Sequence, residues 1–160
     1  MTGIIFLLLT WGGPEPMNVS PGDPIINVPI TTLDGTQLKL KDALHNSMCF
    51  IISTDCPHCL DALPIIMSQF SETYHTTILF LDPVDKVRAF LKKRPLDEKI
   101  DFYTVNHKDL KPYNIKTIPA LLGYKAGRLR LAFHGPLNPE RGSWLVDMYE
   151  NPTPIGGRKP

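Results

Sequence analysis

The fold of this chain is decided by one stretch of sequence, Met48-Cys49-Phe50-Ile51-Ile52-Ser53-Thr54-Asp55-Cys56-Pro57-His58-Cys59. Its first five residues form a short continuous apolar run, which is typical of a strand buried on both faces of a sheet. Its last four residues are a Cys-x-x-Cys motif at the start of a predicted helix. Two thiols at this spacing can close a small disulfide, and a helix N-terminus favours thiolate at the upstream thiol. The stretch therefore indicates electron or disulfide transfer.

The helix after the motif is predicted to begin near Pro57, because proline is tolerated in the first helical turn. Pro64 falls inside the helical pattern and is expected to kink the helix. The apolar residues that recur at helical spacing are Leu60, Leu63, Ile66, Met67 and Phe70.

The rest of the chain alternates between strand and helix signals. Two β-prone runs, 28–33 and 36–40, flank Asp34-Gly35, which is a strong hairpin signal. Further strands are expected at 76–81, 101–105, 120–124 and 129–133, and helices or helical turns at 41–45, 84–93, 108–113 and 139–149, the last with Asn138 as N-cap. This order predicts an α/β domain in which a mixed sheet is flanked by helices, and a Cys-x-x-Cys pair in that setting favours a redox site.

Composition bounds the class of protein. A chain of 160 residues with 42% hydrophobic residues suggests one domain with a buried core. A net charge of +1, from 17 basic and 16 acidic residues, gives no electrostatic case for nucleic-acid binding. Three cysteines are too few for a disulfide-stapled scaffold. Cys49, left over in the apolar run, is expected to be a buried, inert thiol; the alternative is a resolving or regulatory cysteine.

The two ends of the chain differ from its middle. Residues 1–20 are interpreted as the remnant of a leader or membrane anchor followed by a linker, because residues 3–9 resemble the apolar core of a signal peptide. No Lys or Arg precedes Lys39, and the apolar run is too short to span a bilayer, so a buried first strand is the alternative. Residues 21–150 are the predicted domain, and 151–160 a flexible tail. An export signal predicts an extracytoplasmic location.

Over residues 21–149 the sequence resembles thioredoxin-fold proteins, in particular the extracytoplasmic TlpA/ResA group. Besides Cys56-Pro57-His58-Cys59, the resemblance rests on the leading hairpin, on Pro64, and on Ile118-Pro119 followed by residues 120–124 and Gly127. It implies a thioredoxin-like mixed sheet with an added N-terminal β-hairpin. It also implies that Pro119 is cis and faces the disulfide, and that the backbone of Ile118 meets an extended substrate.

The resemblance implies a thiol–disulfide oxidoreductase without a cofactor. Cys56 would be the exposed nucleophile and Cys59 the resolving thiol, while Pro57, His58, Ile118 and Pro119 would tune the pair or bind substrate. The implied partners are protein substrates with thiols or disulfides and a redox partner protein, with a membrane-bound one as an option. Periplasmic tasks such as cytochrome c biogenesis belong to this group.

The sequence also departs from the family pattern. Asp55 stands where the fold often has Trp, and Phe50 and Ala62 stand where relatives carry acids that relay protons to the second thiol. Asp55 and Asp82 are candidate substitutes, although each is expected to be a solvated or capping carboxylate. The dipeptide Pro57-His58 resembles that of DsbA-type oxidants, whereas many TlpA/ResA proteins reduce their targets, so the direction of transfer stays open.

Other uses of the motif remain as alternatives. A structural zinc site usually needs four Cys or His ligands, and the chain has a single Cys-x-x-Cys with scattered histidines. A copper chaperone of the same fold would need a further ligand. A maturation factor that docks one dedicated partner is an alternative of another class.

Overall fold

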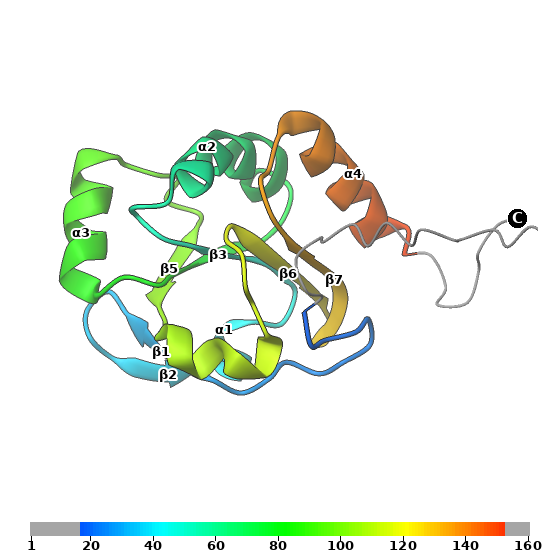
Figure 1. The fold of residues 1–160 in the computed structure, drawn as a ribbon, viewed down its shortest axis with the longest axis horizontal. Helices are drawn as coiled ribbons and strands as arrows, with labels where there is room; N and C mark the ends of the chain where they lie inside the picture. Colours follow the sequence, from blue (N-terminus) through cyan, green and yellow to red (C-terminus); the bar gives the residue numbers. More distant parts are fainter. Residues whose placement is uncertain (1–16, 153–160) are drawn as a thin grey trace, which may run out of the picture.

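The computed structural model describes residues 17–152, drawn in colour in Figure 1. Most of the predicted leader or anchor remnant and linker (1–20) and most of the predicted tail (151–160) lie outside the described residues.

The described residues form an α/β domain with strands and helices close to the predicted ones (Figure 1). The strands are β1 (Pro29–Thr32), β2 (Gln37–Lys39), β3 (Ser47–Ile52), β4 (Thr76–Phe80), β5 (Asp101–Thr104), β6 (Ala120–Lys125) and β7 (Arg128–His134). The helices are α1 (Leu40–Ala43), α2 (Pro57–Ile65), the π-helix η1 (Ile66–Ser71), α3 (Val84–Lys93), the 3₁₀-helix η2 (His107–Tyr113) and α4 (Pro139–Glu150).

The strands make one seven-stranded mixed sheet in the order β2-β1-β5-β4-β3-β6-β7. The three central strands β5, β4 and β3 are parallel, and hairpins add an antiparallel pair at each side. In the register of β3, Phe50 lies beside Ile78 of β4 and Leu121 of β6. The predicted mixed sheet with an added N-terminal hairpin is confirmed.

Strand β3 is one of the three central strands, and all six of its residues are buried. Successive side chains of a strand point to opposite faces of the sheet, so β3 contributes to two separate cores. Phe50 packs in the core under α2, η1 and α4, and its ring meets that of Phe70 edge-on at 5.0 Å. Ile51 packs in the core on the other face, with residues of α1 and η2.

The helix after the motif does not simply kink at Pro64. It stays α-helical from Pro57 to Ile65 and then continues as the π-helix η1. Proline has no N–H to donate to the preceding turn, which removes one α-helical hydrogen bond shortly before the change. The predicted apolar face is retained, since Leu63, Ile66 and Phe70 are buried.

The turn and cap signals at the two ends of the domain are confirmed. In the first hairpin the N–H of Thr32 donates to the carbonyl of Thr36, and Gly35 adopts a φ of 92°, which favours glycine. At the start of α4 the side chain of Asn138 accepts the N–H of Arg141 at 2.8 Å, as expected of an N-cap.

The segment before β1 packs onto the domain. The N–H of Asn18 donates to the carbonyl of Tyr113 at 2.9 Å, and the N–H of Gly22 to that of Leu129 at 2.7 Å. An isolated bridge joins Pro24 to Arg128 at the start of β7.

Candidate active site

Cys56 and Cys59 are joined in a disulfide at the N-terminus of α2, with their Cα atoms 5.1 Å apart. Cys56 is the N-cap residue and is partly buried, whereas Cys59 is fully buried beneath the first turn. A reagent from solvent therefore reaches the sulfur of Cys56 before that of Cys59. This asymmetry is the one that thiol–disulfide exchange with a large substrate requires.

The start of α2 favours negative charge on the sulfur of Cys56. The N–H of Cys59 points at that sulfur, with 3.2 Å between N and Sγ, and Pro57 occupies the first helical turn. Unpaired N–H groups and the helix dipole stabilise a thiolate at this position. Pro57 and His58 are exposed, so His58 lies at the surface within the same turn.

Ile118 and Pro119 lie beside the disulfide, and the peptide bond between them is cis. The carbonyl oxygen of Ile118 is 3.9 Å from Sγ of Cys56. The sheet explains this closeness: β6 runs antiparallel to β3 with Ala120 opposite Ile51, so the residues before β6 meet those that follow β3. The structure thus brings together the four residues of the motif and the two residues of the predicted proline loop.

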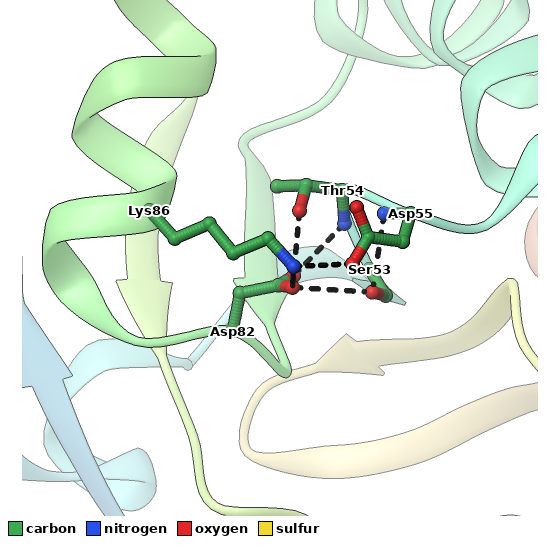
Figure 2. Close-up of polar contacts among 5 residues, drawn as sticks. All are labelled: Ser53, Thr54, Asp55, Asp82 and Lys86. Atoms are coloured by element: carbon green, nitrogen blue, oxygen red, sulfur yellow. Dashed lines mark hydrogen bonds and ion pairs between the residues drawn. The ribbon is translucent and has the colours of Figure 1, made fainter.

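Polar contacts stabilise the loop that leads into Cys56 (Figure 2). They form a cluster of five residues, Ser53, Thr54, Asp55, Asp82 and Lys86. The carboxylate of Asp82, in the turn between β4 and α3, accepts the N–H of Thr54 at 2.8 Å and its hydroxyl at 3.0 Å. The hydroxyl of Ser53 lies 3.3 Å from the same carboxylate. Lys86, in the first turn of α3, forms ion pairs with Asp82 at 3.2 Å and with Asp55.

The charge state of this cluster follows from its contacts. Burial raises the pKa of Asp82, but hydrogen bonds from Thr54 and Lys86 outweigh it, so the pKa is lowered below its ordinary value. The hydrogen bond to Asp55, followed by that to Asp82, raises the pKa of Lys86. Asp82 is therefore a carboxylate and Lys86 an ammonium group at neutral pH.

The expectations for the two carboxylates have different outcomes. Asp55 is solvated as expected, with 74% of its side chain exposed. The expectation of a solvated or capping Asp82 is wrong, because its side chain is only 6% exposed and the N-cap of α3 is Pro83. Lys86 was not singled out from the sequence, although a Lys four residues after an Asp at a helix start is a known pairing signal.

Cys49 is buried and lies apart from the disulfide. It belongs to the core on the α1 and η2 face of the sheet, while Cys59 belongs to the core on the α2 face. Burial raises the pKa of the Cys49 thiol above its ordinary value. This placement agrees with an inert thiol and separates Cys49 from the exchange chemistry.

Two features of residues 17–152 bear on the alternatives. No group of three or more His, Cys, Asp or Glu side chains in that range is arranged to hold a metal ion. Among the same residues no helix has the length and apolar character needed to cross a membrane.

Comparison with known proteins identifies the fold. Neither a protein-family model nor a curated protein sequence matches the chain. Solved structures do: a provisionally assigned protein disulfide isomerase from Bacteroides thetaiotaomicron has a TM-score of 0.67 and 18% identity, covering 84% of this chain and 91% of its own. A thiol:disulfide interchange protein from a Bacteroides species has a TM-score of 0.65 and 10% identity, covering 88% and 97%. StoA from Bacillus subtilis has a TM-score of 0.55 and 20% identity, covering 78% and 98%.

The chain therefore has a thioredoxin-like fold, as the sequence resemblance implied. The Cys56–Cys59 pair lies at the N-terminus of α2, the helix that follows β3, one of the three central strands of the sheet.

Proposed function

We propose that the protein is a thiol–disulfide oxidoreductase that exchanges disulfides with extracytoplasmic protein substrates through Cys56 and Cys59. One observation carries this proposal: a disulfide whose reachable sulfur caps a helix and lies 3.9 Å from the carbonyl oxygen of Ile118. The helix end favours a thiolate, and the neighbouring carbonyl can accept a backbone N–H of an extended substrate.

In the reducing direction the thiolate of Cys56 attacks one sulfur of a substrate disulfide. The substrate S–S bond breaks, a mixed disulfide forms at Cys56, and the first substrate sulfur leaves as a thiolate. Cys59 then loses its proton and attacks the sulfur of Cys56, which releases the second substrate thiolate. Two electrons pass from the dithiol to the substrate, and its two sulfurs take up the protons. In the oxidising direction the same steps run in reverse.

The extracytoplasmic setting and the partners are part of the proposal. The apolar run at residues 3–9 supports export, and oxidising compartments are where protein disulfides persist. Among the structural neighbours are proteins described as thiol:disulfide interchange proteins, which supports protein thiols or disulfides as substrates. A separate redox partner protein would restore the starting state of the pair after each exchange.

An insulin-reduction assay with dithiothreitol tests the proposal. The wild-type chain should accelerate reduction, Cys56→Ser should lose the activity, and Cys59→Ser should accumulate a mixed disulfide on non-reducing gels. Cys49→Ala, a change to the third cysteine in the opposite core, is the matched control and should retain the activity. A copper or zinc complex of one metal per chain without any thiol exchange would contradict the proposal and favour a metal-binding module.

A further inference from the structure

The loop that carries Cys56 is held from one side by the carboxylate of Asp82. The N–H and hydroxyl of Thr54, two residues before Cys56, both donate to Asp82. A backbone hydrogen bond from Leu81 to the carbonyl of Ile52, 2.9 Å long, fastens the same two loops one step earlier. The hydrogen bonds between Thr54 and Asp82 therefore help to set the position of Cys56 relative to Ile118.

The contacts of Asp82 require an ionised carboxylate. Oδ2 accepts the N–H of Thr54, while Oδ1 faces the hydroxyls of Thr54 and Ser53 and the ammonium of Lys86. A carboxylate has only acceptors and can satisfy all four donors. A proton on Oδ2 would oppose the Thr54 N–H, and a proton on Oδ1 would oppose Lys86.

The surroundings of Asp82 contain other titratable groups. Lys86 contacts it directly, and Asp55 lies on the far side of Lys86. His107 and Asp109 line the same cavity of about 560 Å³ that Asp82 borders. Of these groups, Lys86 is the one with a hydrogen bond to Asp82, so it is the main balance for the buried negative charge.

We propose that Asp82 is a positioning residue for thiol–disulfide exchange, which stays ionised and fixes the Ser53–Thr54 loop so that Cys56 faces the Ile118 carbonyl. The inference rests on the proposed function. It also assigns Asp82 a different task from the buried acids of related proteins, because an anion that must accept four hydrogen bonds is a poor proton relay to Cys59.

The test compares Asp82→Asn with Asp85→Asn, since both remove one negative charge near the start of α3. Asp85 is 98% exposed and forms an ion pair with Arg88 at 3.7 Å, and among the described residues its side chain has no hydrogen bond or ion pair with Asp82, Lys86 or Asp55. The rate constant of insulin reduction is measured from pH 6 to pH 9 and divided by the Cys56 thiolate fraction from absorbance at 240 nm. Asp82→Asn should lower this quotient by about tenfold. A displacement of a reacting group by about 1 Å costs on the order of a hundredfold, and loss of one side of the support should shift Cys56 by less than that. Asp85→Asn should leave it unchanged.

The pH dependence of the loss separates positioning from proton transfer. If Asp82 is a positioning residue, Asp82→Asn lowers the quotient by the same factor at every pH. If Asp82 relays protons, the decrease disappears at high pH, because hydroxide then takes over the proton transfer. Recovery of the Asp82→Asn quotient to the wild-type value at pH 9 would overturn the inference. So would a quotient equal to that of the wild type at all pH values, even with a lowered melting temperature, since the role would then be structural only.

Changes at Thr54 keep the inference testable if Asp82→Asn fails to fold. Thr54→Val removes the hydroxyl donor and retains the backbone N–H, and it should lower the quotient by about threefold. Thr54→Ser restores the hydroxyl and should return the quotient to the wild-type value. Equal quotients for both variants would overturn the inference. Absence of exchange in the wild type would overturn the proposed function itself, whereas normal wild-type exchange with unaffected variants would overturn the positioning role alone.

Discussion

The sulfur of Cys56 lies 3.9 Å from the carbonyl oxygen of Ile118, although 62 residues separate the two along the chain. The closeness follows from the antiparallel pairing of β3 with β6, which places the end of one strand beside the start of the other. A thiolate and a backbone acceptor at this separation can engage two neighbouring atoms of one extended peptide. The pairing thus defines where a substrate would lie.

His58→Ala is expected to make the Cys56–Cys59 couple more reducing. A histidine in the first turn of α2 can donate a hydrogen bond or positive charge to the Cys56 thiolate, which stabilises the dithiol form. Its removal should lower the reduction potential by about 30 mV, which is roughly tenfold in the equilibrium constant with glutathione. His45→Ala is the control, because His45 precedes β3 at the opposite end of the sheet from Cys56. No shift, or a shift to a less negative potential, would refute His58 as the tuning residue.

Cys49 is expected to resist alkylation in the folded protein. It is fully buried, and burial raises the pKa of its thiol, so very little thiolate is present at pH 8. After reduction, iodoacetamide should modify Cys56 first, and Cys49 should react only in denaturant. Peptide mass spectrometry checks the order. Modification of Cys49 at the rate of Cys56 in native buffer would indicate an accessible third thiol and reopen a regulatory role.

The contribution of Asp82 to stability is expected to depend on pH. Its folded-state pKa lies below the ordinary 3.8, so its stabilising contribution is fully present above about pH 3.8. The contribution is lost as the pH falls through the lowered folded-state pKa. At pH 7 Asp82→Asn should reduce the free energy of unfolding by about 2 kcal/mol, because charge-assisted hydrogen bonds are lost.

Urea denaturation at pH 7 and at pH 3 measures this dependence. The difference between wild type and Asp82→Asn should shrink at the lower pH, because below about pH 3.8 the unfolded chain binds a proton at Asp82 more readily than the folded protein does. Asp85→Asn should change stability by less than about 0.5 kcal/mol at either pH. A gap between wild type and Asp82→Asn that widens at pH 3 would contradict the assigned charge state.

Gly123→Ala is expected to destabilise the fold. A Cβ atom at this position of β6 would lie 3.0 Å from Cδ2 of Tyr149 and 3.3 Å from Sδ of Met48. Tyr149 is buried, and its hydroxyl donates to the carbonyl of Tyr124, so its ring has little room to move. Overpacking of this kind costs about 1–3 kcal/mol, measurable by urea denaturation. Ser143→Ala, on the exposed side of α4, is the control and should stay within about 0.5 kcal/mol.

The sequence predicted the parts of the fold that depend on local pattern. The buried run at 48–52, the Asp34-Gly35 turn and the Asn138 cap are each encoded by neighbouring residues, and all three are confirmed. The continuation of α2 as a π-helix was not predicted. Ile66 and Phe70 of η1 pack against residues of the sheet and α4, and apolar spacing alone does not distinguish a π-helix from an α-helix.

The candidate site was predictable only in part, for a similar reason. Recognisable motifs contain Cys56, Cys59 and Ile118-Pro119. No motif in the sequence indicates that Asp82 is buried. Asp82 looks like any acid before a helix. Its environment arises when β3 and β4 pair in parallel and bring the Ser53–Thr54 loop to its carboxylate. Hydrogen-bond donors that reach Asp82 from another loop cannot be identified from the residues next to Asp82 in the sequence.

The two edges of the sheet differ from its centre in how much backbone they leave open to another chain. At one edge β2 is three residues long, and at the other the segment around Pro24 occupies the start of β7. Short or covered edges disfavour the addition of a foreign strand, which is a common first step of aggregation. The length of β2 and the segment around Pro24 therefore leave an extended chain little open backbone at β2 and at the start of β7, away from the disulfide.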